Sequence, residues 1–210
     1  MRFNIEKSKE EQKKLARKLI IKNDFDEINT VGGVDQAFIN NKIISAIVVC
    51  EYPTMKVVEK QYAIVDSKIP YIPGFLSYRE SPAIVEAFNK LEIKPDILIV
   101  DGHGITHPRK LGIASHVGLI LDVPTIGISD KLLRGTIKDE KIYIDEDLRG
   151  KLVKTKEHAK PVIISVGHRI SLRTAFGVVE KSIIPPHKLP EPLHLAHRYA
   201  NKIRKEEISE

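Results

Sequence analysis

The sequence has one cysteine, Cys50, and no tryptophan. A single cysteine excludes an internal disulfide, which is typical of proteins from a reducing compartment. Long hydrophobic runs are also missing: the longest, from Ile43 to Cys50, is interrupted by Ser45, whereas a membrane span needs about 20 apolar residues. The opening segment MRFNIEKSKEEQKK contains no apolar core of the kind that a signal peptide requires. We therefore expect a cytoplasmic protein that contacts no membrane.

Several chemistry-bearing motifs are absent as well. The sequence contains no cysteine cluster and no His-Glu-x-x-His motif, which argues against a zinc enzyme. It contains no Walker-type glycine-rich loop, which argues against a P-loop phosphotransferase. Internal repeats and low-complexity segments are also missing, and 42% hydrophobic with 30% charged residues is ordinary globular composition. With 210 residues, we expect a single domain over 1–210.

Positive charge is in modest excess. Lys and Arg number 34 against 28 Asp and Glu, for a net charge of +6, and this favours an anionic partner such as nucleic acid. Residues 1–22 hold eight Lys and Arg against three Glu. This basic N-terminal segment is either a solvated helix face or an arm that contacts a nucleic-acid backbone.

The pattern of apolar residues predicts an α/β protein. Three runs rich in Val and Ile, with short links, predict an antiparallel meander. Helix and strand then alternate, so we expect a core over 30–205 with a mixed sheet and helices on both faces. We expect residues 144–160 to form an exposed loop. The expected strands are Thr30–Ile39, Ile43–Cys50, Lys56–Val65, Ile97–Val100, Thr125–Ile128, Lys138–Tyr143 and Val162–Val166, and the expected helices are Ser8–Lys22, one capped by Ser81 with Pro82 in its first turn, Lys110–Leu121, Ser171–Val179 and Leu193–Lys205.

Three carboxylates stand in positions that need an explanation. Asp101 ends a buried strand and precedes Gly102, where open α/β sheets place their sites, although it could simply cap the turn. Asp35 lies inside an expected strand, so it faces either solvent or a cation. Glu80 precedes an expected helix, where the helix dipole or a capping box with Ser77 would explain it equally well.

Taken together, three separate acids in a basic protein suggest phosphate chemistry. Hard oxygen ligands suit Mg²⁺, with Mn²⁺ as a substitute, better than zinc. A carboxylate-held Mg²⁺ can promote attack on a phosphodiester, and the positive charge would attract the polymer.

Two long motifs make the sequence recognisable: YIPGFLSYRESP at 71–82 and DGHGITHPRKLGIASH at 101–116. Shorter segments accompany them, namely GVD at 33–35, PTIGIS at 124–129, SVGHR at 165–169 and LPEPLHLAH at 189–197. On these motifs the chain resembles the endonuclease V family over about residues 30–200. The resemblance implies a ribonuclease H-like fold and a DNA repair enzyme. Such an enzyme nicks the second phosphodiester bond 3′ to deoxyinosine, leaving 3′-hydroxyl and 5′-phosphate ends.

The resemblance also implies roles for particular residues. It makes Asp35, Glu80 and Asp101 the metal-site acids and adds His197 as a further catalytic group. It makes Tyr71, Ile72 and Pro73 a wedge that fills the space left by the damaged base. The expected lining of the pocket for that base is Gly74, Leu76, Gly102, Ile113, His116 and Gly127. The candidate phosphate contacts are His107, Arg109, Lys131, His168, Arg169 and Arg173.

One departure from the family stands at residue 130. Where the family usually has lysine, this chain has Asp130 followed by Lys131, so Lys131 would have to substitute through a small shift of the chain. Two other functions stay open: an endoribonuclease acting on inosine in RNA, and a non-catalytic nucleic-acid-binding protein with the same fold. We expect a monomer in each case.

Overall fold

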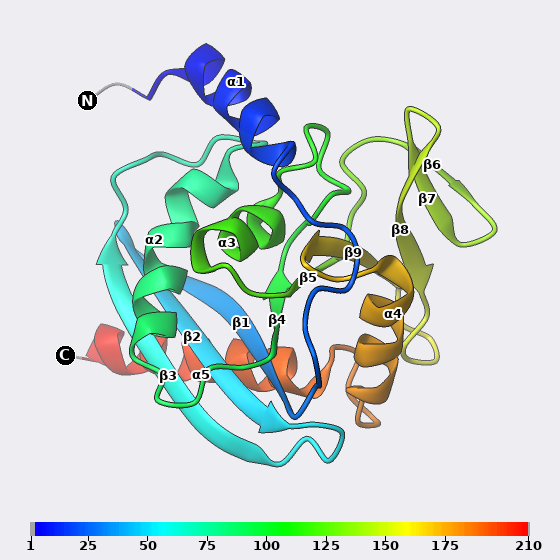
Figure 1. Cartoon of the computed structure of the whole chain (residues 1–210). Helices are drawn as coiled ribbons and strands as arrows, with labels where there is room; N and C mark the ends of the chain where they lie inside the picture. The colour runs from blue at the N-terminus through cyan, green and yellow to red at the C-terminus, as the bar shows by residue number, and fades with distance from the viewer. Residues whose placement is uncertain (1–2, 210) are drawn as a thin grey trace.

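A computed structural model describes residues 3–209 (Figure 1). Its nine strands form one sheet in the order β3-β2-β1-β4-β5-β9-β8-β7-β6. The strands are β1 Thr30–Ile39, β2 Lys42–Glu51, β3 Val57–Asp66, β4 Ile97–Asp101, β5 Thr125–Ser129, β6 Thr136–Lys138, β7 Lys141–Ile144, β8 Asp147–Val153 and β9 Val162–His168. The helices within the described residues are α1 Ile5–Ala16, α2 Leu76–Asn89, α3 Ile113–Leu121, α4 Leu172–Lys181 and α5 Glu191–Ser209.

The sheet is mixed, as the order of elements predicts. β1, β2 and β3 form an antiparallel meander, whose first turn is tight because Asn40 adopts a positive φ of 50°. β4 then pairs with β1, and β5 with β4, both in parallel and after helical crossovers. Parallel strands are buried on both faces, which explains why β4 is apolar up to Asp101 and why β5 is buried throughout.

Helices cover both faces of the sheet, so the predicted α/β class is confirmed (Figure 1). α2 and α3 pack on one face, against apolar side chains that include Val34 and Val100. α4 and the start of α5 pack on the other, against a cluster that includes Val31 and Ile99. Alternate residues of β1 and β4 therefore point to opposite helical layers.

Several predicted boundaries are wrong. The expected strand Lys138–Tyr143 contains the turn between β6 and β7, and the expected helix Lys110–Leu121 begins at Ile113. α2 begins at Leu76 and not at Ser81, so Pro82 lies inside the helix and leaves one helical carbonyl without its N–H donor. Burial of Ser77, Glu80 and Ile84 against the protein outweighs that loss. α1 is capped by Asn4, whose side chain accepts from Lys7 N, and it ends at Ala16.

The stretch 144–160 is not a loop throughout. β8 lies within it and pairs with β7 and β9. Asp147 and Leu148 at its start are exposed, whereas Arg149 and Gly150 are buried. Charged residues alternate along β8, at Asp147, Arg149 and Lys151, so the sequence lacks the apolar run that marks the other strands. Pairing with β7 and β9 on both edges makes it a strand.

No helix among residues 3–209 is both long and apolar enough to cross a bilayer.

Candidate active site

Two of the three acids meet because their strands are parallel and in register. Val34 of β1 lies opposite Val100 of β4, and the next residue on each strand is Asp35 and Asp101. Opposed residues of neighbouring parallel strands point to the same face, with backbones about 4.8 Å apart. Asp35 and Asp101 therefore stand side by side at one end of the sheet.

Glu80 reaches the same place from the opposite helical layer. It lies in the second turn of α2, and its side chain is buried, with 4% exposed. Asp35, Glu80 and Asp101 line one cavity of about 370 Å³. Gln36 and Arg79 line it too. The structure thus brings together the three acids that the sequence left far apart.

The close approach of the acids shifts their proton affinities. Burial raises the pKa of Glu80 to about 7; the positive charge of Arg79 opposes this shift, and the negative charge of Asp35 adds to it. Asp101 as a residue is exposed at the end of β4, yet burial of its carboxyl raises its pKa well above the ordinary value. Asp35 raises it further, through its charge and a side-chain hydrogen bond. The cavity therefore holds more negative charge than the chain compensates.

This donor set fits a hard divalent cation. Carboxylate oxygens are the ligands that Mg²⁺ and Mn²⁺ prefer. A bound cation would relieve the repulsion between the clustered carboxylates and would displace protons from them. Within residues 3–209, however, no group of three Asp, Glu, His or Cys side chains already surrounds a common point as metal ligands. The three carboxylates would have to turn toward a shared ion.

A histidine is bonded to this acid cluster. Nδ1 of His197, in the second turn of α5, lies 2.6 Å from Oδ2 of Asp35. Because the carboxylate can only accept, Nδ1 donates. The Asn201 side-chain amide lies 3.3 Å from Nε2 of His197 and donates to the His197 backbone carbonyl at 2.9 Å. The His197 side chain is 56% exposed, so its outer edge is accessible to a bound substrate.

A second cavity of about 370 Å³ adjoins the first. Four of the six residues expected in the base pocket line it: Gly74, Leu76, Gly102 and Ile113. Tyr71, Leu76, Asp101 and Gly102 line both cavities. Tyr71 is 66% exposed, so its ring stands at the boundary between the acids and the second cavity.

The other two expected pocket residues do not line this cavity. Gly127 lies in β5 with its α-carbon against backbone: a Cβ there would come within 2.5 Å of Gly104 N and 2.6 Å of Gly102 O. It supports the pocket floor from behind. His116 points to the other side of α2, where its ring packs 5.3 Å from that of Tyr78. α3 presents Ile113 to the cavity, whereas His116 lines a separate hollow with Glu11, Tyr78 and Ser81.

Two candidate phosphate contacts are engaged within the protein. His107 Nε2 and Arg109 Nη2 lie 3.2 Å and 2.8 Å from the carbonyl oxygen of Gly74. Burial lowers the pKa of His107 to about 4, so this ring is neutral. Lys131, in contrast, lines the second cavity, while its neighbour Asp130 is paired with Lys188 at 2.6 Å.

The remaining three phosphate candidates lie at the wrong end of the sheet. His168 of β9 is opposite Thr125 at the start of β5, whereas Asp101 is opposite Ile128 near its end. Arg169 is held by Asp24 and Asp122. Arg173 follows in the first turn of α4. β9 runs antiparallel to β5, which reverses the end at which its last residues emerge.

His103 is a site residue that the sequence analysis missed. It lines the second cavity, and its Nδ1 lies 3.0 Å from Thr106 Oγ1 and 3.2 Å from Ser129 Oγ. Burial lowers its pKa to about 4. Its position between two glycines directly after Asp101 was the available signal.

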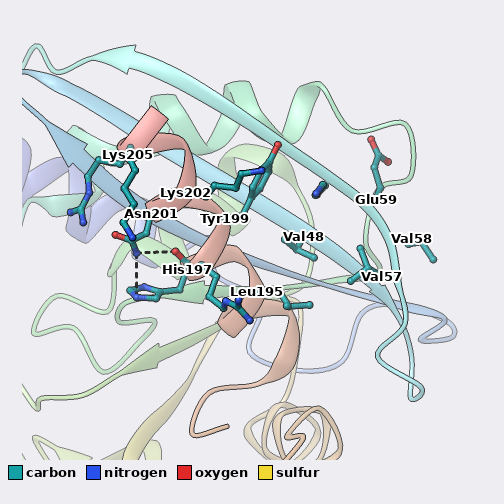
Figure 2. Close-up of a pocket in the computed structure, with 13 residues that line it drawn as sticks. Val48, Val57, Val58, Glu59, Leu195, His197, Tyr199, Asn201, Lys202 and Lys205 are labelled. Atoms are coloured by element: carbon teal, nitrogen blue, oxygen red, sulfur yellow. Dashed lines mark hydrogen bonds between the residues drawn. The ribbon is translucent and has the colours of Figure 1, made fainter. Parts of the chain in front are cut away.

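A basic groove along α5 was also missed. This groove, of about 1180 Å³, is lined by α5 and by β2 and β3, and its lining includes His197. In Figure 2, His197, Asn201 and Lys205 follow one side of α5, with Tyr199 and Lys202 toward the strands that carry Val48 and Val57. Its charged lining is Lys60, Arg198, Lys202, Arg204, Lys205 and a single acid, Glu59. Four basic residues within one helix were the signal in the sequence.

Comparison with known proteins gives a consistent result. A family model described as Endonuclease V matches residues 13–198. Endonuclease V of Dictyoglomus thermophilum is 47% identical over 205 residues, covering 94% of this chain and 90% of that protein. The crystal structure of the Bacillus subtilis protein superposes with a TM-score of 0.91 at 29% identity, covering 99% of this chain and 95% of the other. Ciona intestinalis Endonuclease V, crystallised with a DNA containing an inosine followed by a ribo-adenosine, gives a TM-score of 0.87 at 26% identity, with 96% and 98% covered.

Proposed function

Since this chain belongs to the endonuclease V family, we propose that it is a metal-dependent DNA repair enzyme that recognises deoxyinosine. It is an endodeoxyribonuclease. We propose that it nicks the second phosphodiester bond 3′ to the lesion. The observation that carries the proposal is the convergence of Asp35, Glu80 and Asp101 on one cavity, beside a second cavity able to take a base.

The acids would hold the cation, with Mg²⁺ as the natural ion and Mn²⁺ as a substitute. A bound divalent ion lowers the pKa of water and neutralises charge on phosphate. In the nicking reaction a water oxygen attacks phosphorus and the bond from phosphorus to the 3′ oxygen breaks. The leaving oxygen takes a proton, so the products are a 3′-hydroxyl and a 5′-phosphate.

His197 is the group of this chain best placed to move a proton. Asp35 accepts from Nδ1, so the imidazole is fixed with Nε2 available as a base. The same hydrogen bond links His197 to the acid cluster, because Asp35 is also one of the three acids. We propose that Nε2 accepts the proton that the attacking water loses.

Lesion recognition would use the second cavity and the exposed ring of Tyr71. Extruding a base costs a few kcal/mol of unstacking, and an aromatic ring that takes its place offsets part of this. Tyr71 is both exposed and adjacent to the cavity. Because the two cavities share Tyr71, Leu76, Asp101 and Gly102, the flipped base and the cut phosphate would stay a fixed short distance apart.

The basic groove along α5 would carry the strand beyond the cut. Phosphate contacts dominate the affinity of proteins for nucleic acid, and the groove lining has five positive side chains against Glu59. His197 lines the groove and is bonded to Asp35, so a backbone that leaves the acid cluster would pass into it.

A cleavage assay tests the proposed function. Matched oligonucleotides, with and without one inosine, would be incubated with Mg²⁺, Mn²⁺, Ca²⁺ or EDTA, and the ends of the products mapped. We expect one nick at the second bond 3′ to inosine, with Mg²⁺ or Mn²⁺ only. Faster cleavage of a matched RNA that contains one inosine would identify an endoribonuclease. Binding without nicking in every metal would identify a non-catalytic protein.

Replacing His197 should slow the chemical step. For His197→Ala we expect a fall in the single-turnover rate of about a hundredfold, as for loss of a general base, with inosine-DNA affinity in Ca²⁺ within about twofold to threefold. His194→Ala is the matched control, because His194 lies one turn earlier and stacks on His187 instead, at 3.7 Å. An unchanged rate for His197→Ala would remove this residue from the mechanism.

A further inference from the structure

α1 is a polar helix with two buried side chains, Ser8 and Gln12. Gln12 has 0% of its surface exposed. A buried glutamine needs partners for both its carbonyl and its amide, so the place where Gln12 points shows what α1 is anchored to. The stretch matched by the Endonuclease V family model begins at residue 13, directly after it.

The partner of Gln12 is the end of the wedge segment. Gln12 Nε2 donates to the carbonyl oxygen of Gly74 at 3.0 Å, and Arg109 Nε donates to Gln12 Oε1 at 2.5 Å. Arg109 Nη2 donates to the same Gly74 oxygen at 2.8 Å. Gln12, Arg109 and Gly74 therefore form a closed ring of hydrogen bonds that joins α1 to the loop.

His107 supplies a third donor to that oxygen. Its Nε2 lies 3.2 Å from Gly74 O, and its Nδ1 accepts from Arg109 N at 3.2 Å. Because a carbonyl only accepts, Nε2 carries the hydrogen, and the ring is the neutral tautomer. Three donors, one from α1 and two from the loop that carries His107 and Arg109, thus fix the orientation of one peptide group.

The backbone at Gly74 explains why such fixing is needed. Its φ is +80°, in the left-handed region that other residues rarely adopt, and a Cβ there would lie 3.0 Å from Arg109 Nη2. Tyr71, Ile72 and Pro73 precede it without a regular element to hold them. The peptide after Gly74 is therefore the fixed end of an otherwise exposed loop.

A second contact anchors the other side of this segment to α1. The hydroxyl of Tyr78 lies 3.1 Å from Glu11 Oε2 and 3.3 Å from the backbone oxygen of Ser8. Phe3 adds ring contacts to Phe75 and Tyr78, at 5.4 Å and 5.7 Å between centroids. α1 thus holds residues 71–78 from two points, and its exposed basic side chains are not part of these contacts.

We propose that Gln12 is a positioning residue that holds the wedge segment through the Gly74 carbonyl and thereby sets the preference for inosine. The role in preference rests on the proposed function; the positioning of residues 71–78 does not. Gln12 touches neither the acids nor the second cavity, so it acts through the loop.

Gln12→Glu separates the two hydrogen bonds. The carboxylate keeps the size of the side chain and still accepts from Arg109, but it has no hydrogen to donate to Gly74. Gln12→Ala removes both bonds, and melting temperatures confirm folding of each variant. Lys13→Gln is the matched control, since Lys13 is the next residue, is exposed and is paired with Glu10. This control also tests whether α1 acts by charge alone.

Hydrogen exchange of the free protein tests the positioning. The Phe75 and Tyr78 amides donate to the carbonyls of Ile72 and Phe75, so they report on the closed segment. We expect exchange in this segment to be at least about tenfold faster in both Gln12 variants and unchanged in Lys13→Gln. Unchanged exchange in both Gln12 variants would overturn the proposal.

Binding in Ca²⁺ tests the consequence for recognition. We expect the ratio of affinities for inosine-bearing and plain DNA to fall about tenfold in both Gln12 variants, as for a lost buried hydrogen bond. A 2-aminopurine beside the inosine should brighten less on binding. Lys13→Gln should instead weaken both DNAs equally, or neither. Faster exchange with an unchanged ratio would overturn the link to preference. A wild-type protein without inosine preference would refute the proposed function. The hydrogen-exchange rates would still show whether Gln12 holds residues 71–78 in place.

Discussion

Asp101→Asn should abolish nicking while making the metal-free protein more stable. The substitution removes one of three carboxylates that meet in the acid cavity, and with it a ligand oxygen and negative charge. We expect the nicking rate to fall by at least about a thousandfold in Mg²⁺. In EDTA, relief of like-charge repulsion should raise the melting temperature by about 2–4 °C, for about 1 kcal/mol at this exposed position.

The gain in stability should depend on pH in a defined direction. The pKa values of Asp101 and Glu80 are raised in the folded protein, so the folded state binds protons more tightly than the unfolded state. The stability that protonation gives is present below about pH 4 and is lost as the pH rises through the folded values, about 7 for Glu80. The difference between variant and wild type in EDTA should thus be larger at pH 8 than at pH 5.

Metal binding supplies the control for this prediction. Mg²⁺ should raise the melting temperature of the wild type and do so much less for Asp101→Asn. Binding of inosine DNA in Ca²⁺ should stay largely intact in the variant, which separates lost chemistry from lost folding. Mg²⁺-dependent nicking by Asp101→Asn at the wild-type rate would remove Asp101 from the metal site.

Gly33→Ala should destabilise the fold and the site together. A Cβ at Gly33 would overlap the backbone of Pro192 and Leu193 at the start of α5. Because the atoms it meets are backbone, the helix itself must move away from β1. We expect a loss of about 2–4 kcal/mol in the free energy of unfolding, or about 5–15 °C in melting temperature. Nicking should fall at least about tenfold, since the same shift carries His197 away from Asp35.

Gly177→Ala is the matched control for the loss at Gly33. Gly177 lies inside α4, and a Cβ there meets nothing within 4 Å. Alanine is the better helix former, by about 0.8–1 kcal/mol, so this variant should melt slightly higher and nick normally. An unchanged melting temperature for Gly33→Ala would mean that α5 does not press on β1 as the structure has it.

Sequence patterns predicted the mixed sheet because its signals are local. Runs of Val and Ile mark β1, β2 and β4 whatever surrounds them, and Asp101 stands out because it ends a buried run. The start of α2 was placed wrongly for the converse reason. Ser81 and Pro82 carry a strong local signal for a helix start, and only burial of Ser77 and Glu80 against distant elements extends the helix back to Leu76.

The sequence marked Asp35, Glu80 and Asp101 as candidate site residues, but it did not show that they meet in one cavity. Parallel pairing of β1 with β4 decides that Asp35 stands beside Asp101, and α2 on the opposite layer decides that Glu80 joins them. The direction of β9 sends His168 and Arg169 to the far end of the sheet. The contact of Gln12 with Gly74 spans 62 residues. Spacing along a chain fixes which residues share a helix or a strand face, whereas pairing partners and strand direction depend on the whole packed core.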